Sequence, residues 1–128
     1  MRRLAAFLAC LAGPALAGGL EIDVIGETVT GTIQIDLLEE VAPLHAAQIS
    51  ALAEQGAYDG VVFHRVIEGF MAQTGDPTGT GQGGSSLPDL KQEFNPMPHL
   101  RGTVSMARAQ SEDSANSQFF ITFMPRFA

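Results

Sequence analysis

The sequence is short of cysteine and of positive charge, and both shortages narrow the possible functions. Cys10 is the one cysteine among 128 residues, so no disulfide can form within the chain. Seven lysines and arginines stand against 14 aspartates and glutamates, which gives a net charge of −7. So acidic a chain lacks the basic surface that binds nucleic acid or an anionic membrane face. We therefore expect neutral or basic polypeptides as partners.

Long apolar runs are also missing. The longest, residues 4–16, is shorter than the roughly 20 residues that span a bilayer. It follows Arg2 and Arg3 and ends in Ala15-Leu16-Ala17, the pattern of a cleaved secretory signal peptide. We predict a signal peptide over residues 1–17, cut after Ala17. An uncleaved membrane anchor and a lipoprotein site at Cys10 are the alternatives.

Cleavage would leave one domain, residues 18–128, in the periplasm or secreted. It would remove Cys10 and two arginines but no acidic residue, and the net charge would move from −7 to −9. The mature protein would then have no membrane attachment. We expect it to be a monomer.

Motifs for metals, nucleotides and nucleophilic catalysis are absent or incomplete. His45, His64 and His99 share no metal-ligand spacing, so we expect each to be a structural histidine with its hydrogen bonds made. Residues 79–84 match G-x-G-x-x-G, but neither a strand before them nor a helix after them is expected. We attribute these glycines to loop flexibility. No G-x-S-x-G motif occurs, although a triad formed only in space stays open. We predict no cofactor and no metal.

Apolar and polar residues alternate in two early segments. Leu20, Ile22 and Val24 alternate with acidic residues, and the same period of two runs through residues 32–37. A glycine-containing turn separates the two segments. This pattern predicts an antiparallel hairpin.

One helix is expected, beginning near Pro43 and ending before Gly56. Its predicted apolar side consists of Leu44, Ala47, Ile49, Leu52 and Ala53. Further short strands are predicted over residues 61–66, 70–73, 93–94, 102–106 and 117–123, with an ordered surface loop over residues 74–88. Many short strands and one helix predict a mainly β protein, a closed or nearly closed antiparallel β-barrel capped by the helix.

Polar side chains interrupt three of the apolar strands. Arg65 shares a strand face with Phe63, Gln73 with Met71, and Gln118 with Phe120. Apolar stripes usually mean only a core. Because each strand pairs an apolar surface with a hydrogen-bonding group, we interpret them instead as a recognition surface.

These segments resemble the cyclophilin family. F-H-R-x-I-x-G-F-M-x-Q at residues 63–73 is followed by Gly75-Asp76-Pro77-Thr78, then Ser105-Met106-Ala107, then Ser117-Gln118-Phe119-Phe120. The likeness extends from about Leu20 to the end of the chain. It implies a cyclophilin-like barrel and peptidyl-prolyl cis–trans isomerase activity on proline-containing polypeptides, here during the folding of exported proteins.

The resemblance also assigns roles to residues. It implies that Arg65 is catalytic, and that Phe70, Met71 and Phe120 form the apolar pocket for the proline ring. The groups that hydrogen-bond the substrate backbone would be Gln73 and Gln118, and the neighbouring groove would be lined by Ala107 and Arg108. Isomerisation makes and breaks no covalent bond, so it requires neither a nucleophile nor a metal.

Two departures from the family pattern affect these expectations. Arg108 stands where many members have asparagine. The chain ends at Ala128, where the family continues into further strands and a second helix, so we expect a barrel that is incomplete at its C-terminus and a sequence that is a fragment. The alternative function is a non-catalytic module or chaperone that binds proline-containing segments. A hydrolase and a nucleotide-binding protein receive little support from the sequence.

Overall fold

The computed structural model describes residues 4–8 and 18–125. Within that part the strands form two antiparallel sheets. The first has the order β1-β2-β3 and the second the order β4-β5-β7-β6. The elements are β1 (Leu4–Leu8), β2 (Gly19–Ile25), β3 (Thr30–Asp36), α1 (Pro43–Glu54), β4 (Arg65–Ile67), β5 (Met71–Thr74), β6 (Val104–Met106) and β7 (Phe119–Thr122).

The predicted hairpin is confirmed as β2 and β3. The register pairs Ile22 with Ile33, and the turn closes with a 2.8 Å bond from the Gly26 amide to the Val29 carbonyl. Leu20 and Ile22 are buried while Asp23 is exposed. The alternation of apolar and polar residues in the sequence therefore predicts correctly which face of β2 packs against the core.

Part of the predicted signal peptide appears as a strand. β1 pairs with β2 in antiparallel register, from Leu4 opposite Val24 to Leu8 opposite Leu20. The other residues of the predicted signal peptide, including its cleavage site and Cys10, lie outside the described residues. The signal peptide therefore stays a prediction.

The predicted helix is confirmed as α1, with Pro43 in its first turn and Gly56, at φ 73°, just after its end. Its predicted apolar side is wrong in part, because Leu44 is 53% exposed and Ala47 is exposed too. The buried residues of α1 are His45, Ala46, Ile49, Leu52 and Ala53. The helix α1 packs on the sheet β1-β2-β3. The position of this sheet, rather than the composition of the helix, determines which face of α1 is buried.

Two strand predictions need correction. The strand predicted over residues 61–66 begins only at Arg65, because the Val61 amide bonds the Tyr58 carbonyl in a turn and the Val62 carbonyl accepts the Thr74 hydroxyl. No strand forms at residues 93–94, where the Glu93 carboxylate instead binds the start of α1.

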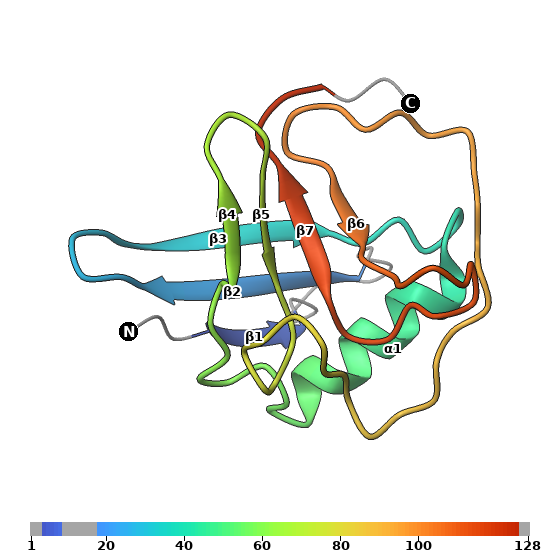
Figure 1. The fold of residues 1–128 in the computed structure, drawn as a ribbon, viewed down its shortest axis with the longest axis horizontal. Helices are drawn as coiled ribbons and strands as arrows, with labels where there is room; N and C mark the ends of the chain where they lie inside the picture. Colours follow the sequence, from blue (N-terminus) through green and yellow to red (C-terminus); the bar gives the residue numbers. More distant parts are fainter. Residues whose placement is uncertain (1–3, 9–17, 126–128) are drawn as a thin grey trace.

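The two sheets cross each other in projection, with β2 and β3 running across the strands of the second sheet (Figure 1). Core residues from both sheets and from α1, among them Ile22, Leu52 and Phe119, pack into one cluster. Within residues 4–8 and 18–125, no strand pairing joins the sheets. The fold is thus mainly β with one helix, an incomplete barrel as predicted.

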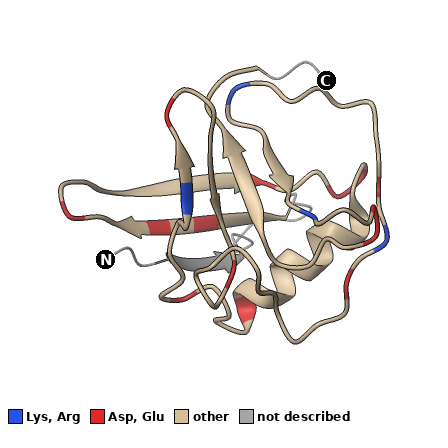
Figure 2. Cartoon of the chain, in the orientation of Figure 1, with Lys and Arg blue, Asp and Glu red and all other residues tan. Residues whose placement is uncertain are grey.

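Acidic residues are spread over the hairpin, the helix and the loops, and basic residues are few (Figure 2). In the described part of the chain, no helix has the length and apolar character needed to cross a membrane.

Candidate functional site

Three predicted site residues lie in one row across the second sheet. Arg65 on β4 is opposite Gln73 on β5, and Gln73 is opposite Phe120 on β7. Side chains of directly opposed residues in antiparallel strands project from the same face. Ala72 and Ile121 directly neighbour Gln73 and Phe120 in the chain, so their side chains project from the other face of the sheet. Phe119 projects from that same face and is part of the core. The row therefore faces away from the core, and Arg65 is exposed.

The predicted apolar pocket lies beside this row. Met71 is two residues before Gln73 on β5 and so shares its face, where it is 3% exposed. Phe70 directly precedes β5 and is half-buried, as is Phe120. The ring of His99 meets the Phe120 ring edge-to-face, with centroids 6.3 Å apart. No local pattern indicated a role for His99, because this contact joins a loop residue to a strand 21 positions later in the chain.

Gln73 and Gln118 are joined directly. The Gln73 amide Nε2 donates to Gln118 Oε1 at 2.9 Å. The Gln118 Nε2 in turn donates to the carbonyls of Gly81 at 3.1 Å and Gly83 at 2.9 Å. These bonds connect the predicted substrate-binding glutamines to the loop that follows β5.

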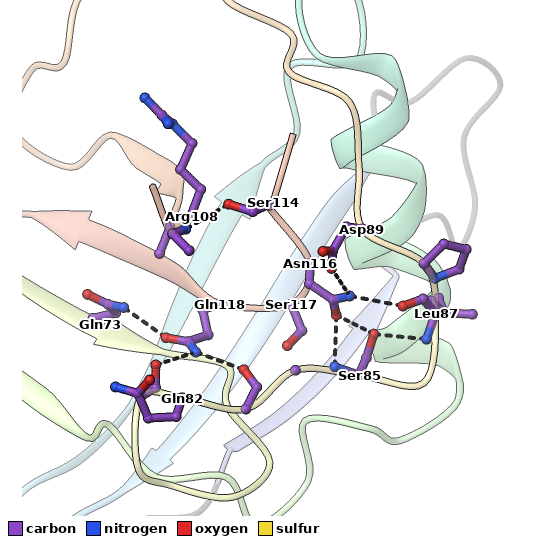
Figure 3. A pocket seen from close by; sticks show the side chains of 16 residues that line it. Gln73, Gln82, Ser85, Leu87, Asp89, Arg108, Ser114, Asn116, Ser117 and Gln118 are labelled. Carbon is purple, nitrogen blue, oxygen red and sulfur yellow. Dashed lines mark hydrogen bonds between the residues drawn. The ribbon is translucent and has the colours of Figure 1, made fainter. Parts of the chain in front are cut away.

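A groove of about 740 Å³ adjoins the row. It is lined by Gln73, Ala107, Arg108 and Gln118 together with loop residues 81–85, Ser114, Asn116 and Ser117 (Figure 3). The structure thus brings four of the eight predicted site residues into the groove and places Arg65, Phe70, Met71 and Phe120 outside its lining. The guanidinium carbon of Arg108 lies 5.5 Å from the centroid of the exposed Phe94 ring.

The far wall of the groove depends on Asn116, which sequence reasoning missed. Its Oδ1 accepts bonds from the Ser85 amide at 2.8 Å and the Ser85 hydroxyl at 2.6 Å, and its Nδ2 donates to the Leu87 carbonyl and to Asp89 (Figure 3). These partners are 27 to 31 residues away in sequence, so no local pattern could indicate them.

The glycine-rich loop is held by a buried carboxylate. Asp76 is 0% exposed. Its Oδ2 accepts the amides of Gly81 at 2.6 Å and Gly83 at 3.0 Å, and its Oδ1 accepts the amide of Thr78 at 2.8 Å. The Thr78 hydroxyl also donates to Asp76. The interpretation that these glycines serve loop flexibility is therefore wrong.

Close approach and backbone conformation explain the glycines instead. A Cβ at Gly83 would lie 2.3 Å from Asp76 Oδ1, and Gly81 has φ +88°. Gly75, at φ +96°, lets the chain approach Ser117, whose hydroxyl donates to the Gly75 carbonyl at 2.7 Å. Residues with a Cβ rarely adopt such positive φ values.

Burial alone would raise the pKa of Asp76. Hydrogen bonds from Gly83, Thr78 and Gly81 together outweigh that effect and hold the pKa well below its ordinary range. The hydrogen bonds around Asp76 therefore favour its ionised form.

His45 and His64 differ in whether their ring nitrogens have hydrogen-bond partners. His45 is buried and its Nδ1 contacts the Glu93 carboxylate, which confirms it as a structural histidine. The prediction is wrong for His64, whose buried Nδ1 has no hydrogen-bond partner among the described residues. Within the same residues, no group of three or more His, Cys, Asp or Glu side chains could hold a metal ion.

Comparison with known proteins shows the family of this chain. The family model described as cyclophilin type peptidyl-prolyl cis-trans isomerase/CLD matches residues 22–126. A Brucella suis protein named as a probable peptidyl-prolyl cis-trans isomerase is 48% identical over 133 residues, which cover 93% of this chain and 68% of that protein. A peptidyl-prolyl cis-trans isomerase of Synechococcus elongatus is 46% identical over 100 residues, covering 78% of this chain and 68% of that protein.

Solved structures show the same likeness. The crystal structure of a cyclophilin type peptidyl-prolyl cis-trans isomerase from Cryptosporidium parvum superposes with a TM-score of 0.71 at 36% identity, covering 75% of this chain and 63% of that one. Cyclophilin AquaCyp293 from Hirschia baltica gives a TM-score of 0.68 at 29% identity, covering 75% of this chain and 55% of that one. This chain thus spans about two thirds of the length of several of these relatives.

Fold and site together define a mainly β protein with a groove beside a sheet face that carries apolar, amide and guanidinium groups. The chain belongs to the cyclophilin-type peptidyl-prolyl cis–trans isomerase family. The predicted family and the predicted cyclophilin-like fold are confirmed. The roles of individual site residues stay predictions.

Proposed function

We propose that this protein accelerates cis–trans rotation about X–Pro bonds in exported polypeptides, with Arg65 as its catalytic residue. The observation that carries the proposal is the cross-strand row, in which Arg65 is opposite Gln73 and Gln73 is opposite Phe120. A guanidinium, an amide and an aromatic ring therefore share one exposed sheet face beside the buried Met71.

The physical problem is the resonance of the amide bond. It sets a rotation barrier of about 18–20 kcal/mol, so uncatalysed X–Pro exchange takes on the order of tens of seconds. A reaction in milliseconds needs a rate increase of about four decades, which corresponds to roughly 5–6 kcal/mol of transition-state stabilisation.

The twisted amide differs from the planar one at the proline nitrogen. As conjugation is lost, this nitrogen recovers a lone pair that a donor can bind. An arginine keeps its charge and presents several N–H donors in a fixed plane. Arg65 would therefore bind the twisted amide more strongly than the planar one, which is the requirement for catalysis.

The neighbouring groups would hold the substrate while it twists. Phe70, Met71 and Phe120 would contact the proline ring, and the Gln73–Gln118 pair would hydrogen-bond the peptide backbone. The groove by Ala107 and Arg108 would receive the peptide segment next to the proline. A Cryptosporidium parvum relative has been crystallised in the presence of the dipeptide Ala–Pro, which supports proline-containing peptides as substrates.

We also propose that the mature protein acts in the periplasm or outside the cell, as a monomer. Arg2, Arg3, the apolar residues 4–16 and the Ala15-Leu16-Ala17 ending support export by a signal peptide. N-terminal sequencing of the protein from its native host would test this proposal. A mature chain beginning at Gly18 is expected, and a chain beginning at the initiator residue would contradict it.

Isomerase activity is tested by exchange NMR on a peptide with one X–Pro bond. Catalytic amounts of the protein should broaden the cis and trans resonances of the residue before proline. Binding is measured in the same samples from chemical-shift changes at higher protein concentration. Shift changes without faster exchange would identify a non-catalytic binding module and contradict the proposal.

A further inference from the structure

The loop between β5 and the groove has hydrogen bonds on two sides. On one side Gly81 and Gly83 donate their amides to the Asp76 carboxylate, at 2.6 Å and 3.0 Å. On the other side the carbonyls of the same two glycines accept the Gln118 amide, at 3.1 Å and 2.9 Å. A buried charge is thus connected to a groove residue through two glycines.

These bonds fix the orientation of the Gln118 side chain. A primary amide has two N–H donors at one end and an acceptor oxygen at the other. The two carbonyls of the loop take both donors, so Gln118 Oε1 must face away from the loop. That oxygen accepts the Gln73 Nε2 at 2.9 Å (Figure 3). Gln73 is thereby held by its nitrogen end, next to Arg65 and Phe120 in the cross-strand row.

We propose that Asp76 is a positioning residue for the isomerase reaction, which acts through Gly81 and Gly83 to orient Gln118 and, through it, Gln73. The inference rests on the proposed function, because it assigns Gln73 to the surface that binds the peptide. It also changes the part expected of Gln118. Both donors of its amide serve the loop, so Gln118 orients Gln73 rather than donating to the peptide.

The position requires a carboxylate rather than any polar group of the same size. Every hydrogen bond to Asp76 comes from a donor: the amides of Thr78, Thr80, Gly81 and Gly83, and the hydroxyls of Thr78 and Thr80. An asparagine would set its own N–H donors against backbone N–H groups on whichever side its amide lay. Complete burial excludes water as a replacement acceptor. The depressed pKa of Asp76 is consistent with an ionised acceptor.

The main test compares Asp76→Asn with the exposed control Asp36→Asn, which loses the same charge on β3. We expect Asp76→Asn to lower kcat/KM for an X–Pro peptide about tenfold, and Asp36→Asn to change it less than twofold. The side-chain amide resonances of Gln118 should move toward those of a solvent-exposed glutamine in Asp76→Asn alone. A folded Asp76→Asn protein with the wild-type kcat/KM would overturn the proposal.

A double-mutant cycle separates positioning from general structural support. If Asp76 acts through Gln118, then Asp76→Asn should lower kcat/KM less than twofold in a Gln118→Ala background. A purely structural role would give the same tenfold loss in both backgrounds, and that result would also overturn the proposal.

A milder variant covers the case in which Asp76→Asn does not fold. Thr78→Val removes the hydroxyl bond to Asp76 at almost constant volume, and Thr78→Ser restores it. We expect kcat/KM and the Gln118 resonances to be perturbed in Thr78→Val and recovered in Thr78→Ser. Wild-type Gln118 resonances in a folded Thr78→Val protein would count against the proposal. If the wild-type protein itself fails to accelerate exchange, the proposed function fails, while the Gln118 resonances still test the connection from Asp76.

Discussion

Among the residues that line the groove, Arg108 carries the positive charge and Asp89 the negative charge. Arg108 is exposed and lies over the Phe94 ring. Because a charge at a groove rim acts on whatever segment lies there, Arg108 should influence which residue is preferred before proline.

We predict that the wild type prefers peptides with glutamate over lysine in the two positions before proline. An exposed ion pair contributes about 0.2–1 kcal/mol, so the ratio of the two kcat/KM values should lie between about 1.5 and 5. Arg108→Glu should invert the ratio, and salt should bring it toward one. A ratio that is the same in wild type and Arg108→Glu would show that the substrate does not pass Arg108.

Gly75 and Gly60 offer a matched pair of glycines with positive φ. Gly75 has φ +96° and its added Cβ would lie 2.3 Å from the Ser117 carbonyl oxygen, whereas Gly60 has φ +77° and no atom within 4 Å of the added Cβ. Gly60→Ala should lower the free energy of unfolding by about 1–2 kcal/mol through backbone strain alone. Gly75→Ala should cost clearly more, since the backbone of Ser117 and Gln118, directly before β7, must also shift. Denaturant unfolding of both variants checks this, and equal losses would contradict it.

At the scale of single residues, the sequence motifs indicated the family but not the contacts that the site residues make. The motif around Arg65 and Gln73 is local, so its letters alone indicated the family. The contacts of Gln118 with Gly81, and of His99 with Phe120, join residues far apart in the chain. Only the folded geometry reveals them.

Among the elements, α1 begins without a local cap. Ala42 offers no side-chain acceptor. The Glu93 carboxylate, from a loop about 50 residues later, accepts the amides of Leu44 at 3.0 Å and His45 at 2.8 Å. It also contacts the His45 ring. A negative charge at a helix N-terminus is further stabilised by the helix dipole.

Glu93→Ala should therefore lower the free energy of unfolding by about 0.5–2 kcal/mol, the range found for lost helix caps. Glu112→Ala is the control, since Glu112 is exposed, and should change it by less than about 0.5 kcal/mol. Urea unfolding followed by circular dichroism measures both. Equal stability of the two variants would show that Glu93 does not support α1.

The same carboxylate explains why one predicted strand is absent. A short strand is predicted at Glu93 and Phe94, but Glu93 is held by the start of α1 and Phe94 is 62% exposed. By contrast, the hairpin of β2 and β3 was predictable because its pattern follows from one buried face. Local patterns predict an element well where its neighbours in space are also its neighbours in sequence.

At the scale of the molecule, two carboxylates, the buried Asp76 and the half-buried Glu93, make stability depend on pH. Burial would raise the pKa of Glu93, but bonds from His45 and Leu44 lower it overall, and the pKa of Asp76 is also depressed. In the unfolded chain these groups titrate near their ordinary values of about 4. Their contribution to the free energy of unfolding is thus complete above about pH 5, and it decreases as the pH falls below about 4.

The wild type should accordingly lose stability between about pH 5 and pH 2.5, and an Asp76→Asn, Glu93→Gln double variant should lose much less over that interval. Denaturation midpoints at several pH values measure this. Parallel pH profiles of the two proteins would show that neither carboxylate is stabilised by its hydrogen bonds.

The architecture could be predicted only in part. Short strands, one helix and family motifs predicted a mainly β, incomplete barrel. The sequence could not predict that β7 lies between β5 and β6, because Gln73 and Phe120 are 47 positions apart and their pairing depends on the register of whole strands. That register places the guanidinium and the aromatic ring on one face.

In the proposed mechanism, the Arg65 guanidinium stabilises the twisted amide more than the planar one. The most direct measurement is exchange NMR on one X–Pro peptide with wild type, Arg65→Lys and Arg65→Ala, together with the Kd of the unreacted peptide for each. We expect catalysed exchange to fall at least tenfold in both variants while Kd changes less than threefold, because a lysine lacks the planar set of donors. Wild-type exchange rates in Arg65→Ala would show that the guanidinium does not stabilise the twisted amide.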